Sequence, residues 1–201
     1  MLGANGYTGT TTIGTGAVLD LGTTGSLAST PTVNVNGGSL LLGGVNQVNA
    51  NAALNLGGTV NHGGGTGASN TVVSQTFGSL TLTANSVIDF SGLAGSSFTV
   101  TGAVALNGNS LKVYDWKQGD SLVFALGSAG VNIQESDLAN VQFFSDLGQT
   151  AITSANITDL NGNAIVPVPE PGVVVSALLL VGMMLVASRR RIAGILARHM
   201  A

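Results

Sequence analysis

The sequence predicts an all-β fold, a parallel β-helix or similar solenoid, followed by a single C-terminal transmembrane helix. Apolar and polar residues alternate in short runs such as Leu80–Leu82 and Ile88–Phe90, which is typical of strands with one buried face. The chain has 30 Gly among 201 residues, and only 7% of its residues are charged. It lacks the Glu, Lys and Arg that solvate exposed helix faces, which excludes a soluble helical protein. The predicted helix is a charge-free apolar run at 172–188.

A repeated turn indicates that the strands are stacked. The segments 36–39 (Asn-Gly-Gly-Ser) and 56–59 (Leu-Gly-Gly-Thr) lie twenty residues apart, and each leads into a new apolar stretch. A turn that recurs at this spacing is typical of a solenoid, in which each turn buries its apolar side chains on the next. Residues 104–113, with a turn at 107–109, predict either a hairpin or a corner between two strands.

We divide the chain into three regions. Residues 1–70 are the Gly/Asn/Thr-rich solenoid region, residues 71–166 are a C-terminal β region with a cap, and residues 167–201 are the tail. Within the second region, the sequence predicts a helical turn at 135–141 and a strand at 142–144. Tyr114 and Trp116 are interpreted as residues that cap the end of the solenoid, because a terminal turn needs a polar outer face.

Charge is distributed unevenly along the chain. Residues 1–166 carry two lysines against eight acidic residues, a net charge of −6, whereas residues 189–201 carry four Arg and no acidic residue. An acidic body without a basic patch excludes nucleic acid as a partner. The chain has no Cys, so it has neither a disulfide framework nor a thiolate site.

Residues that could carry chemistry are few, and we predict no catalytic residue, no cofactor and no metal site. The histidines, His62 and His199, lie on opposite sides of the predicted span, and His62 is interpreted as a solvated residue of a flexible Gly-rich loop. Paired carboxylates can cleave glycosidic bonds, so a carbohydrate-contacting face stays open as an alternative. The residues that could form it are Asp89, Lys112, Tyr114, Asp115, Trp116, Lys117 and Asp120.

The N-terminal segment resembles a known repeat. Residues 3–13 (Gly-Ala-Asn-Gly-Tyr-Thr-Gly-Thr-Thr-Thr-Ile), followed by Gly-Ala-Val-Leu at 16–19, are similar to the autotransporter-associated β-strand repeat, with Gly6 where Thr is usual. The resemblance implies a right-handed parallel β-helix or similar solenoid that is exported and displayed. Residues 1–6 lack the basic and apolar parts of an export signal, so we expect the natural chain to extend further at its N-terminus.

The apolar run at 172–188 has the properties of a membrane span. A helix of these seventeen residues is about 25 Å long, near the lower limit for a bilayer core. Its nine Val and Leu residues favour insertion by roughly 3–5 kcal/mol in total. The run is apolar on all sides and is followed by Arg189, Arg190 and Arg191, which argues against a buried core helix. The positive-inside rule places these arginines in the cytoplasm and the β body outside it.

A proline-rich segment precedes the span. Val168, Pro169, Glu170 and Pro171 cannot be helical, so the backbone is held extended and accessible to an enzyme. This motif, the span and the Arg cluster, in that order at the end of the chain, resemble the PEP-CTERM sorting signal. The resemblance implies processing by exosortase, an integral membrane enzyme of the cysteine type, in a Gram-negative-type envelope that is often rich in exopolysaccharide. A plain tail anchor is the alternative.

These patterns predict an exported structural or adhesive protein that is not an enzyme. We expect it to be anchored in the inner membrane with its body outside the cytoplasm, and after processing to lie at the cell surface or in the medium. The predicted partners are exosortase and the membrane, with exopolysaccharide as a further one. The alternative is the C-terminal part of a polysaccharide-acting β-helix enzyme. Against it, Asp20 is the single charged residue within residues 1–88.

Overall fold

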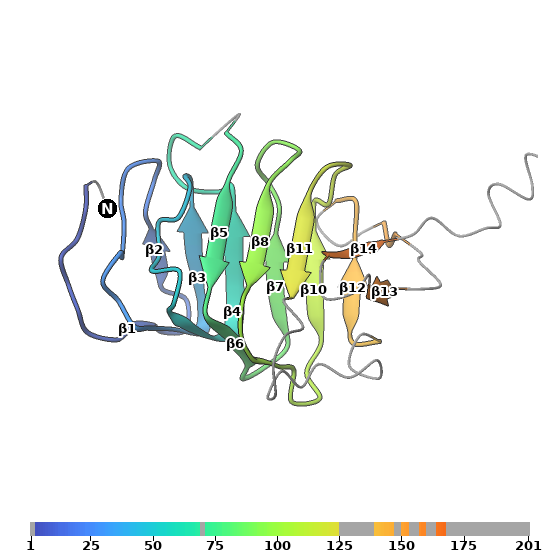
Figure 1. The fold of residues 1–201 in the computed structure, drawn as a ribbon, viewed down its shortest axis with the longest axis horizontal. Helices are drawn as coiled ribbons and strands as arrows, with labels where there is room; N and C mark the ends of the chain where they lie inside the picture. The colour runs from blue at the N-terminus through green and yellow to red at the C-terminus, as the bar shows by residue number, and fades with distance from the viewer. Residues whose placement is uncertain are drawn as a thin grey trace, which may run out of the picture.

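The computed structural model describes residues 3–68, 71–124, 139–146 and 150–152, together with the backbone of 157–159 and 164–167. These residues form an all-β structure, a parallel β-solenoid of about five turns whose strands lie side by side along the long axis (Figure 1). The predicted β-solenoid is therefore confirmed. The described residues contain no helix of the length and apolar character needed to cross a membrane. The span predicted at 172–188 lies outside these residues.

The strands are short except for two that bend around an edge of the solenoid. In chain order they are β1 (Thr11–Ile13), β2 (Val18–Asp20), β3 (Thr32–Leu42), β4 (Ala53–His62), β5 (Ser74–Phe77), β6 (Ser79–Leu82), β7 (Ser86–Asp89), β8 (Ser97–Val100), β9 (Val104–Ala105), β10 (Leu111–Tyr114), β11 (Ser121–Phe124), β12 (Val141–Phe143), β13 (Ile157–Asp159) and β14 (Ala164–Pro167).

The solenoid has three faces. A nine-stranded sheet covers two of them, because β3 and β4 bend at a register shift between Asn36 and Ser39. We call the first face the part made of β1, residues 32–36 of β3, residues 53–57 of β4, β6 and β9. The second face consists of β2, the remaining parts of β3 and β4, β7, β10 and β12. The third face is a five-stranded sheet in the order β13-β14-β11-β8-β5.

Parallel pairing places one turn directly on the next. Val33 pairs with Leu54 and Leu54 with Leu80, so these successive turns are 21 and 26 residues long. The two Gly-Gly turns lie over each other, with Ser39 paired with Thr59, which confirms the stacking predicted from their spacing. β9 pairs in parallel with β6, and β10 pairs in parallel with β7. Residues 104–113 therefore form a corner and not a hairpin.

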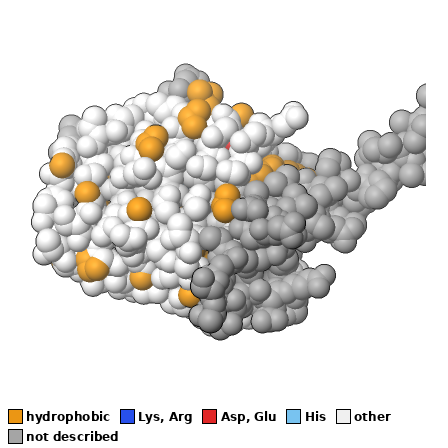
Figure 2. All heavy atoms as spheres, in the orientation of Figure 1, with side chains coloured by type: hydrophobic (Ala, Val, Ile, Leu, Met, Phe, Trp, Pro, Cys, Tyr) orange, Lys and Arg blue, Asp and Glu red, His pale blue; other side chains and the backbone are white. Residues whose placement is uncertain are grey.

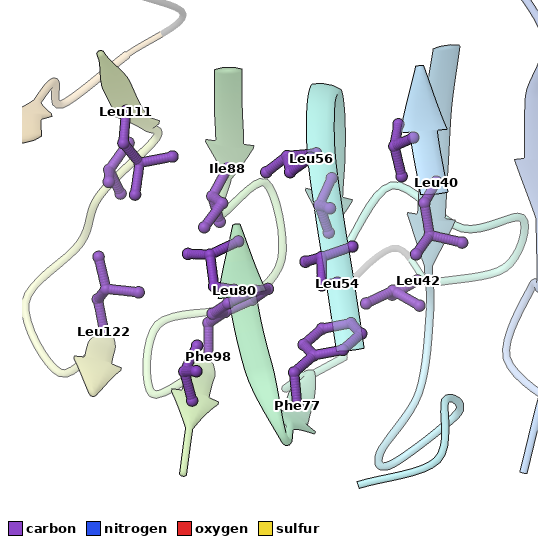
Figure 3. Packing of buried hydrophobic residues seen from close by; sticks show 14 of the residues in the cluster. Leu40, Leu42, Leu54, Leu56, Phe77, Leu80, Ile88, Phe98, Leu111 and Leu122 are labelled. Atoms are coloured by element: carbon purple, nitrogen blue, oxygen red, sulfur yellow. The ribbon is translucent and has the colours of Figure 1, made fainter. Parts of the chain in front are cut away.

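The alternating side chains fill the interior. Every second residue of the strands points inward, and Figure 3 shows these side chains meeting between strands of different faces. The labelled members of this core are Leu40, Leu42, Leu54, Leu56, Phe77, Leu80, Ile88, Phe98, Leu111 and Leu122. All are buried. Because burial of apolar surface is the main favourable contribution to folding, these columns hold the turns together.

The parallel stacking ends with antiparallel segments. β14 pairs antiparallel with β11, and β13 pairs antiparallel with β14. On the other sheet, Phe144 forms an antiparallel bridge with Ala151. On the third face, β14 occupies the edge of β11 that another parallel turn would need.

Charged side chains occupy one side of the molecule. Among the residues whose side chains are described, these are Asp20, Asp89, Lys112, Asp115, Lys117, Asp120 and Asp146. Each lies on the second face or in a loop that follows one of its strands. The strands of the first face carry no charged residue, and among the strands of the third face only β13 carries one, Asp159. On the side of the molecule that Figure 2 shows, the described atoms are mostly backbone and uncharged polar side chains, with scattered hydrophobic side chains among them.

Candidate functional site

The charged residues gather where the second face turns into the third. β7 ends at Asp89, β10 ends at Tyr114, and the loop 115–120 leads into β11. We call Asp89, Asp115, Lys117 and Asp120 the charged corner. The three Asp residues are the acidic candidates of the sequence and Lys117 is one of the basic ones. The stacking of turns brings them together although Asp89 and Asp120 are 31 residues apart.

Asp89 is the most perturbed carboxylate of this corner. It is 7% exposed, and its Oδ2 accepts a hydrogen bond of 3.1 Å from Asn61 Nδ2, whereas its Oδ1 has no partner. Burial, together with the neighbouring Asp115, raises the pKa of Asp89 to about 6, against the opposing effect of Lys117. A proton on Asp89 can be held against Asp115, which satisfies the buried oxygen.

Lys117 links the loops of the charged corner through hydrogen bonds to the backbone. Its Nζ donates hydrogen bonds to the carbonyl oxygens of Phe90, Gly92 and Asp115 at 2.8, 2.9 and 3.2 Å. Asp115 itself adopts a left-handed conformation with φ of 52°. The ammonium group therefore joins the turn of β7 to the turn of β10. This is a structural role, because all three acceptors are backbone groups.

Asp120 also forms hydrogen bonds with the backbone. Its Oδ1 accepts from the Ser96 backbone N–H at 3.0 Å, and its Oδ2 accepts from the Lys117 backbone N–H at 2.8 Å. Burial raises the pKa of Asp120, and the two backbone hydrogen bonds oppose this shift. The carboxylate is 6% exposed. It links two neighbouring loops and offers little surface to a substrate.

The aromatic candidates divide between the core and the surface. Trp116 is 8% exposed and packs edge-to-face between Phe90 and Phe143, with ring centroids 5.3 and 4.9 Å away. The prediction that Trp116 caps the solenoid is therefore wrong, because a further turn covers it and antiparallel strands form the end. Tyr114 packs edge-to-face on Phe144, and Lys112 Nζ lies 5.9 Å from the same ring.

His62 is buried, so its interpretation as a solvated loop residue is wrong. It is the last residue of β4, pairs in register with Leu42 and is fully buried. Its ring lies 5.2 Å from that of Phe90 and 6.0 Å from that of Phe98, and neither ring nitrogen has a hydrogen-bond partner. Burial lowers the pKa of His62 to about 3. The histidine is a neutral core residue at physiological pH.

The charged corner can hold a proton, but it offers few groups that a substrate could reach. Two of its three carboxylates are almost fully buried, and its ammonium group is bound to carbonyl oxygens. No cluster of three His, Cys, Asp or Glu side chains in the described part of the chain could hold a metal ion. The predicted processing residues Val168–Pro171 and the topology residues Arg189–Arg191 lie outside the described residues.

One feature of the first face escaped the sequence prediction. Thr12, Asn34, Asn55 and Thr81 stand in one outward row across four paired strands. They are 22, 21 and 26 residues apart. The signal for this row was the recurrence of Asn or Thr one position after an inward residue of each turn, but the unequal turn lengths obscured it.

Comparisons with known proteins give no relative. No family model, no curated protein and no solved structure matches this chain.

Proposed function

We propose that this protein is an exported structural or adhesive β-solenoid, sorted through a C-terminal signal of the PEP-CTERM type. The observation that carries the proposal is the order of three elements at the end of the chain. Val168–Pro171 supply an extended Pro-Glu-Pro, residues 172–188 an apolar span, and Arg189–Arg191 the positive charge that fixes orientation. The partners in this proposal are the membrane, exosortase as processing enzyme, and exopolysaccharide.

The end of the solenoid supports this arrangement. β14, the last strand that the structure describes, ends at Pro167, and the proposed motif begins at the next residue. An enzyme at the membrane surface would meet the motif between a folded β domain and the span. In this proposal the body lies outside the cytoplasm and is anchored in the inner membrane until processing transfers it to the cell surface or the medium.

The surface of the solenoid supports a structural or adhesive role. The first face carries no charged residue, strands β5, β8, β11 and β14 of the third face carry none either, and Lys117 and Asp120 are engaged with backbone groups. Such a molecule offers extended polar faces for contact, which is how solenoid proteins bind.

A polysaccharide-acting enzyme is the second candidate. It is favoured by one observation, the raised pKa of Asp89 beside Asp115, because a carboxyl group that keeps its proton near pH 6 can act as a general acid. Incubating the full chain with soluble polysaccharides tests this candidate. Release of new reducing ends that Asp115→Asn abolishes would favour the enzyme over the structural protein.

The sorting proposal is tested in a host that contains exosortase. The full chain, fused to an export signal, should lose its tail and leave the inner membrane. Replacing Pro169, Glu170 and Pro171 with Ala should leave an intact, membrane-retained protein, because Ala lets the helix extend into the motif. Arg189–Arg191 changed to Ser should instead disturb the orientation before processing. Equal processing of the Ala variant and the parent would reduce the tail to a simple anchor.

A further inference from the structure

The first face carries an ordered row of uncharged side chains. Thr12, Asn34, Asn55, Thr81 and Ala105 stand in register across five parallel strands. Beside this row runs a second one, made of Thr32, Ala53 and Ser79. Apart from Thr12, which is exposed, the residues of both rows are half-buried, and each contributes a small or amide side chain. The result is a face without large protruding groups.

Hydrogen bonds between neighbouring strands hold the central row in place. Asn55 Nδ2 donates to Asn34 Oδ1 at 2.8 Å, and Asn34 Nδ2 donates to Thr12 Oγ1 at 3.3 Å. Asn55 Oδ1 and the Thr81 hydroxyl form no hydrogen bond to another described residue. The row therefore presents donors and acceptors whose orientation is fixed before a ligand arrives, which lowers the entropic cost of binding.

The charge distribution restricts the ligand. The first face has no charged side chain to pair with a charged ligand. The body as a whole carries a net charge of −6 over residues 1–166, which repels anionic polymers. Amide and hydroxyl groups instead match a ligand that is rich in hydroxyl groups and has no charge.

The size of the face argues against a folded protein as the occupant. Five strands about 4.8 Å apart, the longest contributing five residues of about 3.3 Å each, give a face of at most roughly 24 by 17 Å, or about 400 Å². This is about half of the roughly 800 Å² that each partner buries in a stable protein complex. A linear polymer can cover such a strip completely, and its length allows it to contact several copies of the solenoid, which adds avidity.

We propose that the first face binds a linear, neutral polysaccharide through the Thr12–Asn34–Asn55–Thr81 row. This inference rests on the proposed surface function and specifies its ligand class. The polymer lies along the solenoid axis, and its hydroxyl groups donate to Asn55 Oδ1 and exchange hydrogen bonds with the Thr12 and Thr81 hydroxyls. The charged corner takes no part in this binding.

Affinity electrophoresis of the full chain in a neutral detergent tests the proposal. The gels contain dextran, mannan or hydroxyethyl cellulose as neutral probes, and alginate as the anionic probe. We expect retardation by at least one neutral probe, unchanged by 0.5 M salt. Asn55→Ala combined with Thr81→Ala should weaken it at least tenfold. The matched control is Thr76→Ala combined with Thr99→Ala, which removes two paired hydroxyls from the third face and should leave binding unchanged.

A second variant protects the test against loss of fold. Ala53→Arg leaves the central row intact but places a bulky cation on the same face, and it should also abolish retardation. The proposal would be overturned by the absence of retardation with every neutral probe, or by retardation with alginate alone. It would also be overturned if the third-face control lost as much affinity as the Asn55/Thr81 variant. Self-association that Ala53→Arg abolishes would overturn it too, because a second copy of the chain would then be the occupant. Processing of the tail is measured separately, so binding can fail while sorting succeeds, and the reverse.

Discussion

His62 imposes a pH dependence on the stability of the core. The unfolded chain holds this histidine near its ordinary pKa of 6.5, whereas burial among aromatic rings lowers the pKa to about 3 in the folded state. The folded protein therefore binds fewer protons between these values. The stabilising contribution is complete above about pH 6.5 and is lost as the pH falls, by about 1.4 kcal/mol per pH unit.

Replacing His62 with Leu should remove this dependence. Position 62 pairs with Leu42, so a Leu there would be the same residue as its partner, and it would leave no nitrogen without a hydrogen bond in the core. Relative to the parent, the free energy of unfolding should rise by about 2 kcal/mol more at pH 5 than at pH 8. Urea unfolding at the two pH values measures it. The control His62→Gln cannot titrate but keeps a buried polar group, so it should flatten the pH dependence without stabilising at pH 8. An unchanged slope in both variants would contradict the burial of His62.

Asp89 has the opposite pH dependence. Its folded pKa is raised to about 6, so its contribution is complete below about pH 3.8 and is lost as the pH rises through 6. Asp89→Asn keeps an acceptor for Asn61 and gains a donor for Asp115, and it should therefore be stabilised relative to the parent at pH 8 but not at pH 4. The control is Asp20→Asn. Hydrogen bonds from Thr66 and Gly22 lower the pKa of Asp20, so its removal should destabilise at pH 8. The midpoint of urea unfolding at pH 8 measures both effects. A midpoint below that of the parent for Asp89→Asn as well as for Asp20→Asn would argue against a proton held by Asp89.

The bend between the first and second faces depends on glycine. A Cβ at Gly58 would overlap the carbonyl oxygen of Gly38 in the preceding turn of the solenoid and would lie 3.0 Å from Val35 Cγ1. A Cβ at Gly38 would in turn meet the carbonyl oxygen of Gly14. Successive turns can approach each other at this edge only because their side chains are hydrogen atoms.

Gly58→Ala should therefore destabilise the solenoid by about 1–3 kcal/mol, because the contacting atom belongs to the backbone and cannot rotate away. The matched control is Gly14→Ala, since a Cβ at Gly14 meets nothing within 4 Å. Thermal unfolding followed by circular dichroism compares the two. Similar melting temperatures for both variants would mean that the edge tolerates a wider separation of turns.

Elements with a local signal could be predicted, and those that depend on distant partners could not. Leu80–Leu82 alternates within itself, and the Gly-Gly turns repeat at nearly the length of a turn, so strands and stacking followed from the sequence. His62 precedes a run of glycines, and its place in a strand depends on Leu42 in the preceding turn. Gln75 is buried because it hydrogen-bonds to the backbone of Val48, 27 residues earlier.

The candidate site shows the same division. The clustering of Asp115, Lys117 and Asp120 was visible because these residues are close in sequence. Their structural roles depend on the carbonyl oxygens of Phe90 and Gly92 and on the N–H of Ser96, which belong to another turn. Because turn lengths vary, sequence spacing alone could not identify these partners.

At the scale of the whole molecule, the solenoid is asymmetric along its axis. Its strands are parallel from β1 to β12, and the C-terminal end is closed by antiparallel pairing of β14 with β11. A parallel edge left open is a template for pairing with another chain, and closing it with a strand of opposite direction prevents a further turn from adding. We call the antiparallel strands β13 and β14 the cap. The cap lies directly before the proposed sorting motif, so in our proposal it is the part of the body nearest to the membrane.

Removing the cap should therefore convert the solenoid into a self-associating molecule. A protein that ends at residue 152 lacks β13 and β14 and exposes the edge of β11, whose residues Ser121–Phe124 carry no charge that would oppose pairing. A protein that ends at residue 167 keeps the cap and is the matched control, because both lack the apolar tail. Light scattering coupled to size-exclusion chromatography should give a larger mass for the shorter protein at equal concentration, with the difference increasing as concentration rises. If the two proteins have the same mass per particle at every concentration, the antiparallel strands do not protect this end, and pairing of β14 with β11 contributes only to stability.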